Sequence, residues 1–153
     1  MKTNESDISV KIKINDSSLL PARQTVGSAG YDLSACLKDK TSILIQPQEV
    51  SLIPTGISVE IPIGYEMQVR PRSGLSSKNK LIVINSPGTI DSDYRGEIFV
   101  PIMNLGDKDF EVTHGMRIAQ ILLARTETID WKIVTSLDNT DRSAGGFGSS
   151  GTH

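Results

Sequence analysis

The chain has 153 residues, of which 37% are hydrophobic, and its 16 basic and 18 acidic residues give a formal net charge of -2. This size and composition predict a single domain over residues 1–153 with a real hydrophobic core. Because the basic residues are scattered along the chain, no basic stripe is available for a phosphate backbone, and we expect no nucleic-acid polymer as a partner.

The cysteines, histidines and apolar runs exclude further classes. Cys36 is the only cysteine, so an internal disulfide is excluded, and its Ala-Cys-Leu setting predicts a small buried hydrophobe rather than a nucleophile. With only His114 and His153 available, one chain cannot assemble a zinc site of histidines and cysteines, so any metal would be held by oxygen. The polar start, and the lack of a run of about 20 apolar residues, predict a cytoplasmic protein with no signal peptide and no membrane span.

Short apolar segments separated by turn signals fill the first half of the chain. Residues 1–7 look frayed, and residues 8–14 then alternate apolar and polar side chains, as in a half-buried β-strand. A glycine-hinged loop at 27–30 leads into a short strand in which Asp32 stands between apolar neighbours, so Asp32 is either exposed or faces a polar cleft. Further strands are expected at 43–45, 49–53, 57–61 and 65–70, with turns at 54–56 and 62–64.

Such regular turn signals, with no helical period longer than a turn or two, predict an all-β antiparallel sandwich or barrel. The exception follows Pro71, where we expect a short helix near residues 73–78 with a serine as its N-cap. The unpaired N–H groups at such a helix start form an anion site, and the adjacent Arg72 would add charge. The alternative is a capped surface turn with a solvated arginine.

The stretch 88–98 carries the most chemistry, because it combines a carboxylate at Asp91 with a phenol at Tyr94. Strand-like segments flank it and its turn residues predict a β-ribbon with both side chains near the tip. There Asp91 can reach a ligand, and the alternative is a solvated turn. Later strands are expected at 99–103, 110–112 and 117–124.

The last of these strands and the chain end carry further polar groups. A buried Gln120 would either be satisfied by backbone groups or position a water or an oxyanion. Residues 138–153 are predicted to form a mobile, glycine-rich arm. In this arm Arg142, Phe147 and the serines at 149–150 are the groups that a clamp for a phosphate and a planar base needs.

Five segments resemble the five motifs of the trimeric dUTPase family (deoxyuridine triphosphate nucleotidohydrolases), in the family's order and spacing. They are residues 29–35, 71–78, 88–98, 115–120 and 142–151. The resemblance spans nearly the whole chain, and five motifs in order are far more specific than one. Two departures are Ser143, where the family commonly has glycine, and Ser150, where threonine is frequent; the first would slightly stiffen the arm.

The resemblance implies a jelly-roll-like β-barrel that forms a homotrimer with three active sites at the subunit junctions. It implies Mg²⁺ as cofactor, bound mainly by the substrate phosphates and by waters that Asp32 helps to orient. The implied triphosphate contacts are Arg72, Ser73, Gly74 and Gln120 of one subunit. The implied uracil and deoxyribose contacts are Asn85, Thr89, Ile90, Asp91, Tyr94 and Phe99 of a second. The arm of the remaining subunit would contribute Arg142, Phe147, Gly148, Ser149 and Ser150.

The implied activity is hydrolysis of dUTP to dUMP and diphosphate, which keeps uracil out of DNA and supplies dUMP for dTMP synthesis. Asp91 would deprotonate the attacking water, and Tyr94 would pack under the sugar and exclude a ribose. One alternative is the related dCTP deaminase, which shares the barrel but needs other polar groups aimed at the pyrimidine. Another is a binding module that senses dUTP or a protein partner without turnover.

Overall fold

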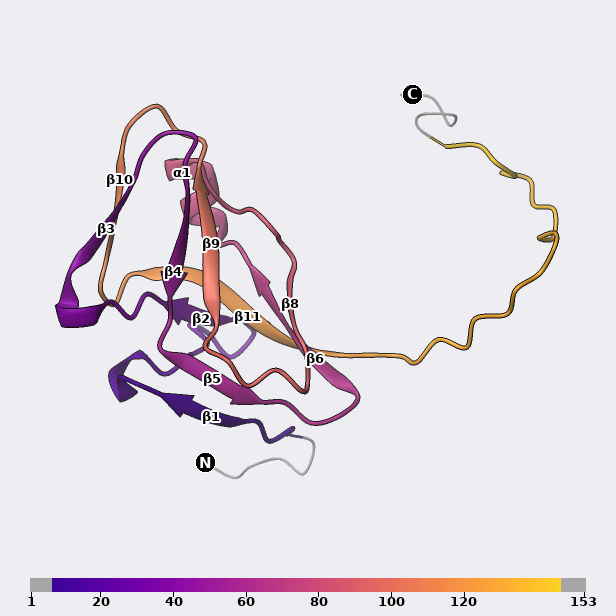
Figure 1. Ribbon diagram of the computed structural model, residues 1–153, viewed down its shortest axis with the longest axis horizontal. Coiled ribbons are helices and arrows are strands. Elements are labelled where there is room, and N and C mark those ends of the chain that lie inside the picture. The colour runs from indigo at the N-terminus through magenta and orange to yellow at the C-terminus, as the bar shows by residue number, and fades with distance from the viewer. Residues whose placement is uncertain (1–6, 147–153) are drawn as a thin grey trace.

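The computed structural model describes residues 7–146, and these contain eleven β-strands, one α-helix and two short 3-10 turns (Figure 1). The first strands are β1 (Lys11–Ile14), β2 (Tyr31–Ser34), β3 (Ser42–Ile45), β4 (Val50–Pro54), β5 (Ile57–Glu60) and β6 (Tyr65–Arg70). Helix α1 (Ser73–Asn79) separates them from β7 (Leu81–Val83), β8 (Gly88–Ile90), β9 (Phe99–Asn104), β10 (Phe110–Thr113) and β11 (Arg117–Arg125). The 3-10 turns are η1 (Ser17–Leu19) and η2 (Lys38–Lys40). The all-β class with one short helix is therefore confirmed.

Two local expectations are corrected. The first strand begins only at Lys11, and the apolar face expected at 8–14 is covered in part: Val10 and Ile14 pack against the core, whereas Ile8 and Ile12 are 43% and 38% exposed. Helix α1 has no serine N-cap: Arg72 occupies that position without a side-chain cap bond, and Ser73 is the first helical residue. The extended backbone of Arg72 precedes the helix, so the serine comes one residue too late to cap it.

The strands form four antiparallel sheets, with orders β2-β11-β6-β8, β4-β9-β7, β1-β5 and β10-β3. Buried side chains from all four, among them Leu33, Ile45, Ile57 and Ile102, form one core. The ladders within residues 7–146 do not join into a closed ring, so the expected barrel is not closed. One reason is visible at Gly56, whose positive φ of 67° turns the chain from β4 into β5 and hence from one sheet into another.

The β-ribbon expected around Asp91 is also corrected. Strand β8 pairs with β6, whereas β9 pairs with β4 and β7, so the two strands that flank the stretch belong to different sheets. The connection over residues 91–98 is too long for a tight hairpin turn, and nothing local holds its ends in one ladder. Asp91 and Tyr94 therefore lie in a loop between sheets.

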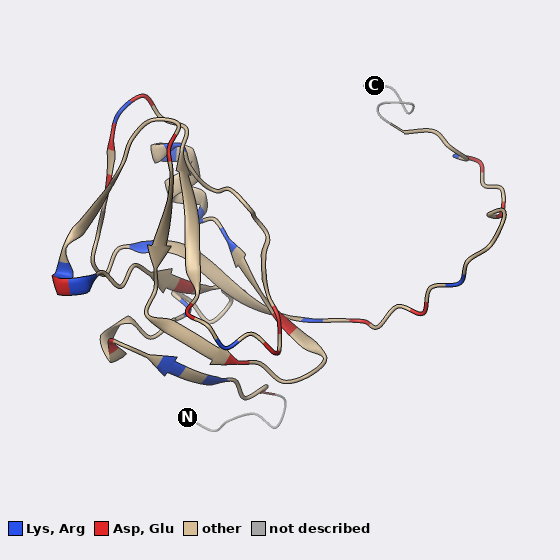
Figure 2. Ribbon diagram, in the orientation of Figure 1, with Lys and Arg blue, Asp and Glu red and all other residues tan. Residues whose placement is uncertain are grey.

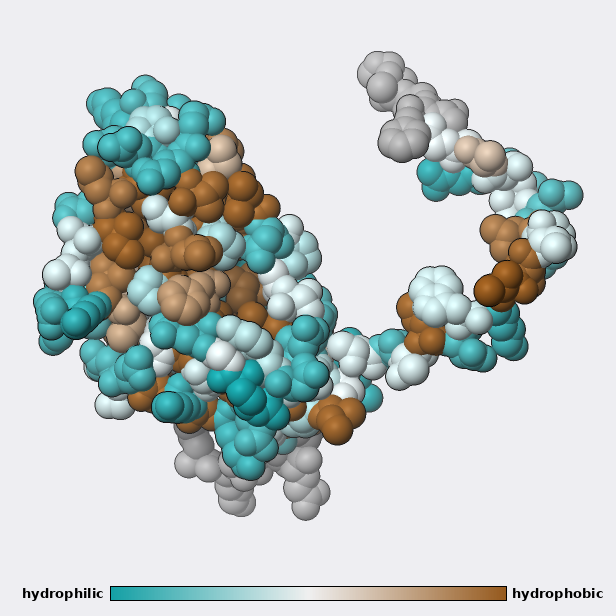
Figure 3. Space-filling view, viewed as in Figure 1, coloured by the Kyte–Doolittle hydropathy of each residue, from teal (hydrophilic) through white to brown (hydrophobic). Residues whose placement is uncertain are grey.

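One sheet has apolar residues on both faces. In β4-β9-β7 the buried face includes Ile53, Val100 and Ile102, while the alternate residues point outward. The outward set, called here the apolar sheet face, is Val50, Leu52, Pro54, Ile82, Ile84, Phe99, Pro101 and Met103. Leu52 is 64% exposed, and Figure 3 shows hydrophobic residues gathered on the front of the body, over β4 and β9. An antiparallel sheet normally exposes polar residues on its outer face, so this face is suited to a partner surface.

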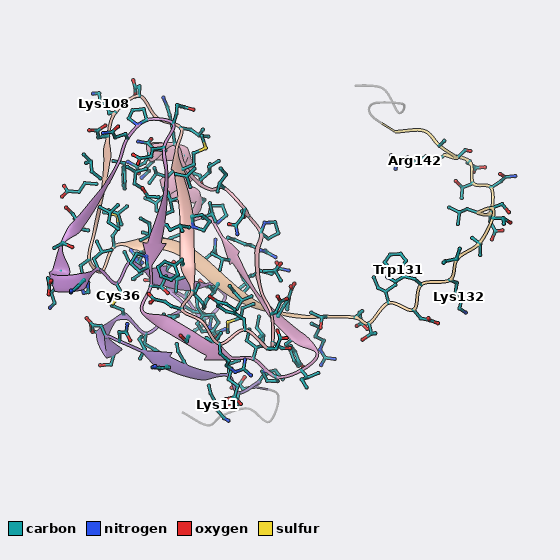
Figure 4. The ribbon with its side chains drawn as sticks, in the orientation of Figure 1. Lys11, Cys36, Lys108, Trp131, Lys132 and Arg142 are labelled. Carbon is teal, nitrogen blue, oxygen red and sulfur yellow. The ribbon has the colours of Figure 1, made fainter. Side chains whose placement is uncertain are left out.

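Beyond β11 the chain leaves the body as an extended segment, residues 126–146 (Figure 1). A bond from the backbone N of Thr126 to the O of Gly64, 3.0 Å long, ties its start to the body. The segment starts well before the predicted arm, and its apolar side chains are exposed: Ile129 61%, Trp131 81% and Ile133 101%. Figure 4 shows Trp131 well away from the sheets. The mobility predicted for 138–153 stays a prediction.

The charged residues are distributed as the sequence predicts: acidic and basic residues are interspersed along the ribbon (Figure 2). Burial raises the pKa of the half-buried Cys36 thiol, and the negative charges of Asp16 and Glu97 raise it further, so the thiol stays protonated at neutral pH. Within residues 7–146, no helix has the length and apolar character needed to cross a bilayer.

Candidate functional site

The first group of candidate residues gathers around Asp32 on β2. Arg72 Nε donates to Oδ1 of Asp32 at 3.0 Å, and Arg117 Nη1 donates to Oδ2 at 3.0 Å. The Asp32 side chain is only 14% exposed, so of the two expectations for this residue the exposed position is wrong, and its carboxylate lies in polar surroundings between two arginines. Arg72 also donates from Nη1 to the backbone O of Arg117, at 3.1 Å. Two guanidinium groups around one carboxylate leave a net positive charge, which favours an anion.

Gln120 joins this group from β11, where it is paired with Asp32 of β2. Its Nε2 donates to the backbone O of Pro71 at 2.9 Å, so the expected backbone partner is confirmed. Its Oε1 lies so close to Gly30 that a Cβ there would collide with it. The amide is thus clamped between the loop of Gly30 and the residues that lead into α1. We call Asp32, Arg72, Arg117 and Gln120 the Asp32 cluster.

The start of α1 adjoins this cluster. The first helical backbone bond runs from Ser76 N to Arg72 O, at 3.1 Å, so the N–H groups of Ser73 and Gly74 precede the helical ladder. A Cβ at Gly74 would meet nothing within 4 Å, so open space surrounds it. Ser73 and Gly74 therefore present free helix-start N–H groups directly after Arg72 in the chain.

The second group lies in the loop that follows β8. A cavity of about 210 Å³ is lined by Thr89, Ile90, Asp91, Tyr94, Glu97, Ile98 and Phe99. Tyr94 is 43% exposed and Phe99 47%, so both rings are open to a ligand. Asn85 does not line this cavity; a Cβ at Gly88 would lie 3.1 Å from its Nδ2, so its amide packs on the start of β8.

Sequence reasoning missed two lining residues, Glu97 and Ile98. Glu97 belongs to the same stretch as Asp91, and an acidic residue directly after Gly96 was the available signal. Its role depends on a partner about forty residues away in the sequence: Glu97 Oε1 accepts from the backbone N of Gly56 at 2.8 Å. Such a partner has no signature in the local sequence.

The two groups lie at opposite ends of β6. Strand β8 is paired antiparallel to β6 with Met67 opposite Ile90, so Asp91 follows beside Glu66, and both residues line one cavity. Arg72 comes after the other end of the strand. Glu66 and Arg72 are six residues apart, or about 20 Å at the rise of an extended chain. A single chain therefore does not bring Asp91 to the Asp32 cluster.

The arm residues form a third, separate group. Arg142 is exposed on the extended segment, and its Nε donates to the backbone O of Gly145 at 2.9 Å (Figure 4). Phe147, Gly148, Ser149 and Ser150 lie outside the described residues. In this chain Arg142 is thus far from both of the other groups.

Comparisons with known proteins identify relatives along nearly the whole chain. A family model described as dUTPase matches residues 16–151. The deoxyuridine 5'-triphosphate nucleotidohydrolase of Orientia tsutsugamushi (strain Ikeda) is 53% identical over 146 residues, which cover 93% of this chain and 97% of the relative. That of Leptospira interrogans (strain Fiocruz L1-130) is 50% identical over 140 residues, covering 91% and 95%. A solved structure of a mutant dUTPase of Staphylococcus bacteriophage 80alpha with dUpNHpp has a TM-score of 0.82 at 27% identity, covering 94% of this chain and 98% of that one.

The close contact between Gly30 and the Gln120 amide can be tested by substitution. Gly30→Ala should destabilise the protein by about 1–3 kcal/mol, because the new Cβ collides with the amide that holds the Pro71 carbonyl. Gly27→Ala is the matched control, since a Cβ there meets nothing within 4 Å, and it should change stability by less than about 0.5 kcal/mol. Urea denaturation at one protein concentration measures both. Equal midpoints would show that the Gln120 amide is free to move aside.

Proposed function

Because the chain belongs to the dUTPase family, we propose that it hydrolyses dUTP to dUMP and diphosphate. In this reaction water cleaves the bond between the α- and β-phosphates. We propose a cytoplasmic role that keeps uracil out of DNA and supplies dUMP for dTMP synthesis. The observation that carries the proposal is the division of the candidate residues into a small cavity with a carboxylate and a positively charged cluster. A nucleotide needs both, one for its base and sugar and one for its phosphates.

The base and sugar are assigned to the cavity beside β8. Strand β8 ends the order β2-β11-β6-β8, so its free edge has backbone N–H and C=O groups from Thr89 to Asp91 for the polar edge of uracil. Phe99 and Ile90 supply apolar walls, and Asn85 would have to turn from Gly88 to join them. Tyr94 would lie under the deoxyribose, where a 2'-hydroxyl clashes with its ring. Wall contacts that leave no room for a 5-methyl group would reject thymine.

Asp91 is assigned the role of general base. Its carboxylate is exposed at this cavity and can hold and deprotonate a water. General-base assistance is typically worth about 10² to 10⁴ in rate, so other groups must stabilise the charge on the phosphates. Arg72, the N–H groups of Ser73 and Gly74, and Gln120 are assigned to this task, with Arg142 from an arm. The remaining N–H of the Gln120 amide is suited to a phosphate oxygen, because the other is bonded to Pro71.

The residues present suit Mg²⁺ held mainly by the substrate. Among residues 7–146 there is no group of three or more histidine, cysteine, aspartate or glutamate side chains that could hold a metal. Each oxygen of Asp32 already accepts one arginine N–H and keeps a lone pair that a water can use. This donor set fits a hard cation that keeps its waters and borrows phosphate ligands, with Asp32 orienting those waters. When bound, Mg²⁺ supplies charge neutralisation on the phosphates.

We also propose a closed homotrimer with sites shared between subunits. Three observations support it: the separation of about 20 Å along β6, the apolar sheet face, and the extended segment with its exposed Trp131. Asp91 of one subunit would meet the Asp32 cluster of another, and the arm of the remaining subunit would lay Phe147 on the uracil and Gly148, Ser149 and Ser150 near the phosphates. Closure of the arm would exclude bulk water.

Substrate choice tests the activity. Incubated with Mg²⁺, the protein should release diphosphate rapidly from dUTP, little from dTTP, dCTP or UTP, and none after EDTA. Diphosphate and ammonia are assayed separately. Ammonia from dCTP would establish a deaminase instead, and dUTP binding without either product would indicate a sensing module.

The role of Asp91 is tested by Asp91→Asn. The amide keeps the shape of the side chain and can still hold a water, so dUTP binding should persist while kcat falls at least about 100-fold. Isothermal titration measures the binding, and diphosphate release measures kcat. A variant that keeps more than about a tenth of wild-type kcat would exclude Asp91 as the base.

Mixed assemblies test the shared site. Asp91→Asn protein and protein truncated after Asp141 should each be nearly inactive, since one lacks the base and the other lacks the arm. After joint unfolding and reassembly in equal amounts, a site should work when its Asp91 comes from a truncated chain and its arm from an Asp91→Asn chain.

Each mixed ring of three contains one such junction. Random assembly makes roughly three quarters of the trimers mixed, so about one site in four should recover. Activity near a quarter of wild type supports arm exchange between neighbours. No recovery, with mixed trimers verified by native mass spectrometry, would mean that each arm serves the Asp91 of its own chain.

A further inference from the structure

The ring of Tyr94 is held in one orientation by the residues that follow it. Its Oη donates to the backbone O of Glu97 at 2.9 Å. Between these two residues Gly96 leaves room for the ring, since a Cβ there would lie 2.6 Å from Cζ of Tyr94. The ring therefore lies on the bare backbone of Gly96, and its far end is tied to residue 97.

Residue 97 is itself tied to the junction between β4 and β5. The Glu97 carboxylate accepts from Gly56 N at 2.8 Å, and this bond is partly buried. The next residue, Ile98, is fully buried and donates from its N to Ile57 O at 2.8 Å. Its O accepts from the buried Thr55 hydroxyl at 2.6 Å. Three hydrogen bonds thus hold residues 97 and 98 against residues 55–57.

The backbone of Gly56, to which Glu97 binds, is itself held in place by its neighbours. A Cβ at Gly56 would lie 2.8 Å from Cys36 Sγ, and the residue has a positive φ, so only glycine fits there. Its O accepts from Asn15 N at 2.9 Å, which ties it to the region just after β1. The N–H that Glu97 binds therefore belongs to the short connection between β4 and β5, which is fixed by contacts on both sides.

The other half of the loop has its own support. Arg95 Nη1 donates to the backbone O of Ser92 at 2.7 Å and to that of Tyr94 at 2.9 Å. These bonds hold the turn next to Asp91 without using Glu97. A change at Glu97 should therefore release the tyrosine ring more than it displaces the carboxylate of Asp91.

We propose that Glu97 is a positioning residue that sets the selectivity of the site for deoxyribose over ribose. Its bond to Gly56 adds to the two bonds of Ile98, and together they fix the backbone O that holds the Tyr94 ring, so that the fixed ring excludes a 2'-hydroxyl. This inference rests on the proposed function, because it assumes a deoxyribose on Tyr94. The proposed role does not depend on the negative charge of Glu97. The partner of the carboxylate is a backbone N–H, so an amide oxygen at the same place would accept the same hydrogen bond.

Three substitutions separate these roles. Glu97→Ala removes the acceptor and Glu97→Asp withdraws it by one methylene, so in both the dUTP/UTP ratio of kcat/KM should fall about tenfold or more, mainly through faster UTP hydrolysis. Glu97→Gln keeps an acceptor at the same reach and should stay within about threefold of wild type. Glu111→Ala is the matched control, since Glu111 is exposed on β10, and its ratio should not change. A Glu97→Asp ratio like wild type, with Glu97→Gln reduced, would show that charge matters and would overturn the proposal.

A second measurement observes the ring without any turnover. The chain has three tyrosines, so protein labelled with 3-fluorotyrosine gives three ¹⁹F resonances, and Tyr94→Phe identifies that of Tyr94. In Glu97→Ala and Glu97→Asp this resonance should move toward the shift of free fluorotyrosine, while those of Tyr31 and Tyr65 stay. Wild-type protein that does not hydrolyse dUTP would refute the proposed function, and the resonance would still report on the ring. An active wild type with an unchanged resonance and ratio in both variants would refute the role of Glu97 alone.

Discussion

The register between β6 and β8 is the constraint on which the site depends. With Met67 opposite Ile90, the antiparallel ladder puts Asp91 at the beginning of β6, while Arg72 follows its end. About 20 Å of extended backbone then separate Glu66, which lies beside Asp91, from Arg72. No side chain spans that distance, so the ladder that organises the sheet keeps the two groups of candidate residues apart within one chain. In the proposed homotrimer, the division of the candidate residues between subunits would follow from strand pairing rather than from any special feature of the loops.

The chain also leaves two apolar surfaces exposed. An antiparallel sheet with one solvated face alternates apolar and polar residues, yet Val50, Leu52 and Ile84 expose apolar side chains on a sheet whose other face is already buried. The extended segment adds Ile129 and Trp131, both of them without a buried environment in this chain. Surfaces of this kind cost free energy in water and favour association. Homotrimer formation would cover both, and it would also supply the missing half of each site.

The charges within the Asp32 cluster are one carboxylate and two guanidinium groups, held together by direct contacts. A carboxylate between two guanidinium groups holds them in place, and Asp32 is mostly shielded from water, which strengthens both contacts. One positive charge remains in excess, so an anionic ligand is still favoured. Gln120 and Gly30 add a steric clamp, because the amide that bonds Pro71 leaves no space for a Cβ at residue 30. Arg72 is thus held by the carboxylate of Asp32, and the preceding Pro71 is held by the amide of Gln120.

Local sequence determined the features that depend on neighbouring residues. The alternation of apolar side chains and the turn residues predicted β2 to β6, the helix after Pro71 and the long last strand, and the motif residues indicated the family, because each signal lies within a few positions. Only the tertiary structure decided which strands pair. The segments around Asp91 look like a hairpin, yet β8 and β9 belong to different sheets. For the same reason the partners of Asp32, the contact of Glu97 with Gly56 and the early departure of the arm were not predictable: they depend on residues distant in sequence, and a local pattern carries no information about which distant segment lies opposite.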